Sequence, residues 1–140
     1  PSLLTLHPSP LAPHPTFHTY MSYGEPFRLG AEASACMLRE GSSVLLVTGI
    51  ANAQPLRDYV QLHYTLERHL NYPDHHVFSG RDLEKIKQLL QENPSWQLVT
   101  TAKDAVRLMH SNIPGWVIPI EVRFFSKESA TAFFQLTLEG

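Results

Sequence analysis

The sequence predicts an α/β fold: a small three-layer α/β/α domain of the Rossmann-like type with a mostly parallel sheet, preceded by an N-terminal β-ribbon and linker. Short apolar runs alternate with segments whose apolar residues recur every three or four positions, the order expected of strands joined by helices. Residues 43–48 (SVLLVT) form an apolar run typical of a strand buried on both faces of a parallel sheet. The 140 residues, 43% of them hydrophobic, suffice for one ordinary domain with its own core.

Residues 1–42 are expected to form the linker and ribbon, and residues 43–140 the Rossmann-like domain. Five prolines, at positions 1, 8, 10, 13 and 15, exclude a helix near the start. Residues 16–23 are rich in aromatic residues and threonine and alternate in part, which indicates a strand. A turn at Gly24–Pro26 would return the chain along residues 27–29, so we predict a two-stranded ribbon here, followed by a loop.

The first helix of the main domain is expected after the strand at 43–48. Asn52 can cap it, and Pro55 fits its first turn. Its apolar positions recur at helical spacing as far as Leu70, and we expect it to end near Arg68, before a short strand at 69–72. The apolar stripe consists of Leu56, Tyr59, Val60, His63, Leu66 and Leu70.

Five further elements complete the pattern. A second helix begins at residues 79–82 and is stopped by Asn93 and Pro94. A strand, a short helix, another strand and a closing helix follow. The later strand is expected near a sheet edge, because Pro119 cannot donate a hydrogen bond to a neighbour. These four elements are predicted at residues 96–101, 103–108, 116–125 and 127–138.

Composition excludes several classes of partner. The formal net charge is −2, with 11 basic and 13 acidic residues, so there is no electrostatic footprint for nucleic acid. The sign also opposes binding to an anionic membrane by charge alone, and no apolar run reaches the roughly 18 residues of a membrane span. The single Cys36 fits a reducing compartment. The chain begins at Pro1 without signal-peptide features, so we expect a piece of a longer protein.

The first candidate site is Asp74-His75-His76, which lies between two predicted elements. Imidazoles can act as general bases, bind metals or orient a carboxylate. Alternatively, one histidine caps the following helix, the other is solvated, and Asp74 makes a bond within the turn. Because all three residues lie at a junction between a strand and a helix, the pattern favours a functional role.

The second candidate is the segment 100–105 (TTAKDA), at the end of a predicted strand and the start of a helix. Its backbone N–H groups could bind an anion together with Thr101 and Lys103. Equally, Thr101 could be a helix N-cap and Lys103 could pair with Asp104 or another neighbour. Residues 49–52 (GIAN) occupy the corresponding place after an earlier strand. Asn52 is a weaker candidate there, because a plain turn explains this segment.

Several familiar motifs are missing from these 140 residues. They include no G-x-x-x-x-G-K-[ST] phosphate loop, no G-x-G-x-x-G, no G-x-S-x-G and no paired-cysteine motif. Residue spacing therefore indicates only a Rossmann-like domain with a site near Asp74–His76, and it predicts no metal site. The N-terminal histidines have no cysteine or carboxylate cluster beside them.

Four segments follow one another along the chain: 17–26 (FHTYMSYGEP), 44–56 with its GIAN turn, 72–83 with YPDHH and a later DL, and 99–107 (VTTAKDAVR). Together they resemble the tetraacyldisaccharide 4'-kinase family, the lipid A 4'-kinases of Gram-negative bacteria. The first of them is similar to the Bacteroidetes branch of the family. Ala102 and Ala53 depart from the family pattern, which usually has Glu and Pro at these positions.

The resemblance implies two Rossmann-like domains joined by a two-stranded ribbon, of which this sequence matches the ribbon and the C-terminal domain. ATP and Mg²⁺ would be bound mainly by the N-terminal P-loop domain, and no cofactor by this chain. The substrate would be the lipid A disaccharide precursor, tetraacyldisaccharide 1-phosphate, at the cytoplasmic face of the inner membrane. Only the missing domain would contact that membrane, peripherally. The chain alone would be soluble and inactive.

The resemblance also implies a role for the Asp-His-His segment. His75, rather than His76, would pair with the catalytic aspartate of the N-terminal domain and orient it, with Asp74 beside it. Two other functions stay open. One is a stand-alone metal-dependent phosphoesterase of the DHH type, with Asp74 and His75 as metal ligands, although the sequence has no D-x-D motif. The other is a non-catalytic interaction domain.

Overall fold

The structure is a computed structural model, and it describes residues 3–5, 18–30, 37–124, 131 and 134–135. The chain divides into two compact units. One unit consists of residues 24–119, and the other combines residues 1–23 with residues 120–140. Each unit has its own sheet.

The unit 24–119 is built on a five-stranded sheet in the order β3-β7-β6-β4-β5. The central strand β4 runs parallel to both β5 and β6, and β6 runs parallel to β7. Only β3 is antiparallel, to β7. The mostly parallel sheet is therefore confirmed. The strands are β3 (Phe27–Leu29), β4 (Ser43–Thr48), β5 (Thr65–Asn71), β6 (Gln97–Thr101) and β7 (Gly115–Ile118).

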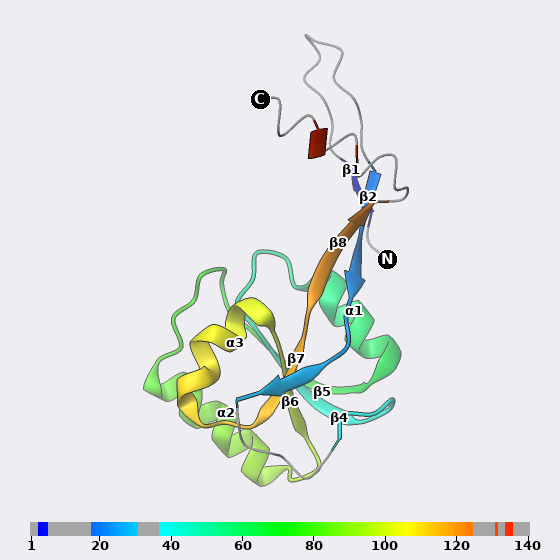
Figure 1. Ribbon diagram of the computed structural model, residues 1–140. Coiled ribbons are helices and arrows are strands. Elements are labelled where there is room, and N and C mark those ends of the chain that lie inside the picture. Colours follow the sequence, from blue (N-terminus) through cyan, green and yellow to red (C-terminus); the bar gives the residue numbers. More distant parts are fainter. Residues whose placement is uncertain (1–2, 6–17, 31–36, 125–130, 132–133, 136–140) are drawn as a thin grey trace. The chain divides into compact units, whose positions relative to one another are not determined.

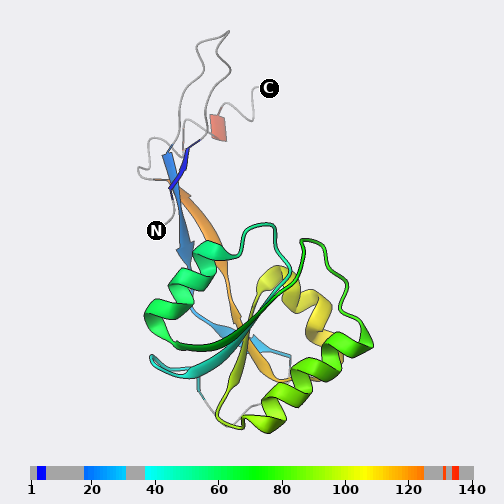
Figure 2. The same cartoon turned by 180° about the vertical axis from the view of Figure 1, so that it is seen from behind.

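Helices cover both faces of this sheet. Figures 1 and 2 show α1 (Gln54–His63) on one side, and α2 (Gly80–Glu92) and α3 (Ala102–Leu108) on the other. A short 3-10 helix, η1 (Met109–Ser111), follows α3. Because both faces are covered, the apolar residues of β4 are fully buried, as its sequence predicted. The three-layer Rossmann-like architecture is confirmed.

The predicted extent of the first helix is wrong. The helix α1 ends at His63, and the following residues form the edge strand β5. Leu66 and Leu70 fit helical spacing, yet in the structure they belong to this strand. As an edge strand, β5 exposes Glu67 and Arg68 to solvent. In the sequence, these charged residues resemble the solvent-exposed side of an amphipathic helix.

The predicted strand at residues 116–125 is two strands. They are β7 and β8 (Ile120–Phe124), which belong to different sheets, and Pro119 lies between them. The predicted edge position is also wrong for β7, which has β3 on one side and β6 on the other. Because Pro119 is outside both ladders, its missing N–H removes no strand-pairing bond.

The other unit contains a three-stranded antiparallel sheet in the order β1-β2-β8. Its remaining strands are β1 (Leu3–Thr5) and β2 (His18–Tyr23). The strand β2 is confirmed, but the predicted ribbon pairing with residues 27–29 is wrong, because β2 pairs with β8. The predicted closing helix at 127–138 lies largely outside the described residues. In the described part of the chain, no helix has both the length and the apolar character to cross a membrane.

Candidate functional site at the carboxyl end of the sheet

The candidate site lies where the order of the parallel strands reverses. Along the chain, β4 is followed by β5 on one side and then by β6 on the other. The loop after β4, the loop after β5 and the start of α3 after β6 therefore meet at one edge of the sheet, and Figures 1 and 2 show both loops there. In open α/β sheets, ligands bind at such a reversal.

Gly49 is the point where these three segments touch. Its backbone N–H donates to Asp104 Oδ2 of α3 at 2.9 Å. A Cβ atom added to Gly49 would lie 3.0 Å from Asp104 Oδ1, 3.4 Å from the carbonyl oxygen of Pro73 and 3.5 Å from His76 Cβ. Glycine is needed here because the backbone after β4 packs directly against the other two segments.

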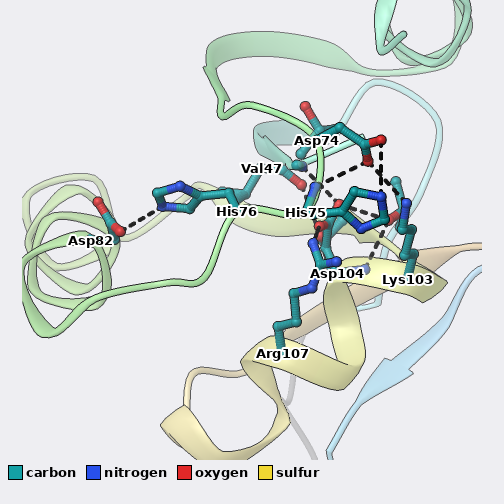
Figure 3. Close-up of polar contacts among 12 residues, drawn as sticks. Val47, Asp74, His75, His76, Asp82, Lys103, Asp104 and Arg107 are labelled. Carbon is teal, nitrogen blue, oxygen red and sulfur yellow. Dashed lines mark hydrogen bonds and ion pairs between the residues drawn. The ribbon is translucent and has the colours of Figure 1, made fainter. Parts of the chain in front are cut away.

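Asp74, His75 and Lys103 come together on the outer side of this contact. Lys103 Nζ donates to Asp74 Oδ1 at 2.9 Å, and His75 Nε2 lies 3.4 Å from Asp74 Oδ2 (Figure 3). The backbone N–H of His75 also donates to Asp74 Oδ1, at 3.1 Å. The hydrogen bond from Lys103 lowers the pKa of Asp74, so this carboxyl group is ionised at neutral pH.

The two histidines occupy opposite environments. The His75 side chain is 74% exposed, and its backbone has a φ of 60°, in the left-handed region. His76 points away from Asp74 and toward Asp82 (Figure 3), with its Nε2 2.8 Å from Asp82 Oδ2. The ring of His76 stacks on Tyr72 with the centroids 4.5 Å apart. His75 therefore faces solvent, whereas His76 is part of the packing of its loop.

The carboxyl group of Asp82 is held by the start of α2. The backbone N–H of Ser79 donates to Asp82 Oδ2 at 2.8 Å, and Ser79 Oγ accepts from the backbone N–H of Asp82 at 3.2 Å. This reciprocal pair is a capping box. The bond from Ser79 N–H, together with that from His76, lowers the pKa of Asp82.

Thr101 and Asn52 make their hydrogen bonds within their own turns. Thr101 is buried, and its hydroxyl donates to Asp104 Oδ2 at 2.8 Å and accepts from the Asp104 N–H at 3.1 Å. Its N-cap role is confirmed. Asn52 Oδ1 accepts from the N–H of Gln54 at 3.2 Å, while Ala53 occupies the N-cap position of α1. The structure thus gathers Asp74, His75 and Lys103, and turns Thr101 toward Asp104.

Two contacts were missed in the sequence: Asp104 with Gly49, and His76 with Asp82. A common signal accompanies both. Thr101 and Asp104, like Ser79 and Asp82, follow the capping pattern in which an acidic residue stands three positions after Ser or Thr. That pattern identifies the helix starts, but it does not reveal that each carboxyl group also binds another segment. Within the part of the chain that the structure describes, no group of three or more His, Cys, Asp or Glu residues could hold a metal ion.

The fold and the site define a Rossmann-like α/β domain with a solvent-facing histidine at its switch point. The family model of tetraacyldisaccharide-1-P 4'-kinase matches residues 8–139. The chain belongs to this family, and the resemblance found in its sequence is confirmed. No solved structure matches the chain.

Curated relatives carry the same name. The chain is 32% identical over 125 residues to the tetraacyldisaccharide 4'-kinase of Phocaeicola vulgatus, covering 80% of this chain and 34% of the relative. For the tetraacyldisaccharide 4'-kinase of Bacteroides thetaiotaomicron the identity is 31% over 96 residues, covering 62% of this chain and 25% of the relative. That of Flavobacterium johnsoniae is 32% identical over 115 residues, with 80% and 32% covered. The matches thus span a quarter to a third of these relatives' length.

Proposed function

We propose that this chain is the C-terminal domain of a tetraacyldisaccharide 4'-kinase. The whole enzyme would transfer the γ-phosphate of ATP to the 4'-hydroxyl of tetraacyldisaccharide 1-phosphate, the lipid A precursor, at the cytoplasmic face of the inner membrane. The names of the relatives and the family match support this assignment. Because the 140 residues contain no phosphate-loop motif, ATP and Mg²⁺ would be bound mainly by an N-terminal P-loop domain of the same protein.

The exposed imidazole of His75 is the observation that best supports this proposal. A non-glycine residue in the left-handed region costs on the order of 1 kcal/mol, so surrounding contacts must hold it there. Here the Asp74 carboxyl group binds both the His75 backbone and Lys103. The imidazole is thus presented outward from a fixed turn, where it can pair with a carboxylate of the facing domain.

Each candidate residue receives a role in this proposal. His75 orients the catalytic aspartate of the P-loop domain and favours its charged form. Asp74 fixes His75, and His76 supports the same loop through Asp82. Lys103 uses one of its three donors on Asp74, which leaves donors for a substrate anion. Asn52 would contribute to that anion site at the same edge, and Thr101 would support it indirectly, because its buried hydroxyl is bonded to Asp104 at the start of α3. Such a division suits phosphoryl transfer, which depends mainly on positioning and electrostatics.

Substitution of His75 in the whole protein tests the proposal. We expect His75→Ala to lower kcat roughly a hundredfold, because the aspartate loses its orienting partner. The Kd for ATP should stay within about twofold, since the nucleotide is bound elsewhere. Steady-state kinetics and nucleotide binding are measured on the same preparations.

The matched control is His110→Ala. His110 is another exposed imidazole, in η1, beyond the opposite end of α3. This variant should keep wild-type kcat. A His75→Ala enzyme with wild-type kcat would show that the assigned role is wrong.

A stand-alone metal-dependent phosphoesterase is less well supported. Lys103 places a positive charge 2.9 Å from Asp74 Oδ1, where a divalent cation would have to bind. Calorimetric titration with Mn²⁺ separates the two functions. Tight stoichiometric binding that Asp74→Ala abolishes would favour the phosphoesterase and contradict the kinase assignment. A plain interaction domain would show neither this binding nor the loss of turnover in His75→Ala.

A further inference from the structure

Asp104 is a fully buried carboxyl group at the centre of the contacts among the three segments. Its side chain has 0% exposure. Oδ2 accepts hydrogen bonds from the Gly49 N–H and the Thr101 hydroxyl, and Oδ1 lies 3.4 Å from Arg107 Nη1 (Figure 3). One side chain therefore binds the N-cap residue of α3, Thr101, and also holds the segment after β4. A helix cap alone requires only the bonds with Thr101.

The contact with Gly49 continues to the turn that presents His75. The N–H of His76 donates to the carbonyl oxygen of Pro73 at 3.1 Å, which closes a turn with Asp74 and His75 at its centre. Both ends of this turn lie close to Gly49, since a Cβ atom added there would be 3.4 Å from the Pro73 oxygen and 3.5 Å from His76 Cβ. The turn thus packs against the backbone segment at Gly49, which Asp104 holds through a buried hydrogen bond.

The first turn of α3 holds the same structure from two sides. Lys103 binds the Asp74 side chain on the exposed side, and the adjacent Asp104 binds Gly49 on the buried side. We propose that Asp104 is a positioning residue for His75, acting through Gly49 and the turn from Pro73 to His76. This inference rests on the proposed function, because it concerns the orientation of the imidazole assigned there.

The replacement Asp104→Asn tests the inference in the whole protein. An amide has nearly the same shape, but it turns an N–H₂ group toward either Gly49 and Thr101 or Arg107, all of which are donors. We expect kcat to fall about tenfold, with KM for ATP changed less than about twofold, because small displacements of a catalytic group lower turnover. A core variant, Ile86→Val, controls for lost stability and should keep wild-type kcat.

A double-mutant cycle shows whether Asp104 acts through His75. In the His75→Ala background, Asp104→Asn should lower kcat by less than about twofold further, because the imidazole it positions is gone. If the two losses multiply, Asp104 acts elsewhere and the inference is wrong. Unchanged kcat in Asp104→Asn, where His75→Ala does lower kcat, would also overturn it. Should Asp104→Asn not fold, Gly49→Ala replaces it in the cycle, because its Cβ would lie 3.0 Å from Asp104 Oδ1.

An NMR measurement separates this inference from the proposed function. The Hε1 and Cε1 resonances of His75, assigned with His75→Ala in protein labelled with ¹³C-histidine, report the surroundings of its ring. They should shift in Asp104→Asn and not in Ile86→Val. Shifted His75 resonances in Asp104→Asn, combined with wild-type kcat in His75→Ala, would show that Asp104 positions His75. They would also reject the role in turnover that is proposed for His75. Unchanged resonances would reject the positioning, whatever the activity.

Discussion

His75 and His76 are adjacent and chemically identical, yet the structure gives them different tasks. A left-handed backbone at His75 turns its imidazole into solvent, and the next residue turns back beneath Tyr72. The His76 ring also meets Phe78 edge-on, with centroids 5.4 Å apart. A substitution at either position therefore tests a different property, activity at His75 and folding stability at His76.

Replacing His76 by alanine should destabilise the fold. The variant loses the stack on Tyr72 and the hydrogen bond to Asp82, both partly buried, so the free energy of unfolding should fall by about 1–3 kcal/mol. Denaturant unfolding measures the change. The exposed control His110→Ala should stay within about 0.5 kcal/mol of wild type. Equal midpoints for the two variants would contradict the packing role of His76.

Asp82 should make stability depend on acid pH. Its pKa is lowered chiefly by the Ser79 N–H and then by His76, so folding favours the carboxylate. Its stabilisation is fully present above the unfolded-state pKa of about 4, and it is lost as the pH falls through the lower folded-state pKa. Asp82→Asn should therefore be less stable than wild type at pH 7 and approach it in acid. Unfolding is measured for both proteins across this pH range. A difference in the free energy of unfolding between wild type and Asp82→Asn that stays constant would contradict the linkage.

At the level of elements, the sequence predicts correctly where the pattern is local. The apolar run of β4, the start of α2 at Ser79 and the start of α3 at Thr101 all have the expected form. Errors arise where distant partners decide. The β2 strand pairs with β8 from the other end of the chain, and Leu66 and Leu70 adopt a strand because β4 offers them an edge. Neither partner is visible in local spacing.

Gly115 offers a test of packing between elements. A Cβ there would lie 2.9 Å from Leu98 Cβ on the neighbouring strand β6, in the core. Gly115→Ala should therefore lower the free energy of unfolding by about 1–3 kcal/mol through overpacking. Gly80→Ala is the matched control in the first turn of α2, where an added Cβ would meet no described atom within 4 Å apart from its chain neighbours and its own helix backbone. It should be neutral or stabilising by up to about 1 kcal/mol. Equal effects would exclude close packing at Gly115.

At the scale of the whole molecule, the candidate site belongs entirely to the unit 24–119. The sequence predicts its location, because Asp74 and His75 stand between two recognisable elements. It does not predict that Asp104 and Gly49 meet beneath them, since these residues are 55 positions apart and their contact depends on the strand order. The exposed residues of the site can therefore be predicted from the sequence. The buried contact that supports them depends on the topology of the sheet.

The 140-residue chain on its own should not transfer phosphate. It contains no phosphate-loop motif, so the γ-phosphate and Mg²⁺ would have no site comparable to that of a P-loop domain. Transfer from radiolabelled ATP to tetraacyldisaccharide 1-phosphate is measured for the chain and for the whole protein side by side. Turnover by the chain alone would contradict the proposed division of the site.

The hydrogen bond from Gly24 N–H to the Pro119 carbonyl oxygen, 2.9 Å long, joins the two ends of the unit 24–119. The next residues outward, Tyr23 and Ile120, are paired across β2 and β8. Pairing these strands in an unfolded chain would require closing the whole intervening loop, at an entropic cost that grows with its length. Once the unit has folded, its ends are already adjacent. Its folding should therefore precede and nucleate the pairing of β2 with β8, which would form as a late, fast step.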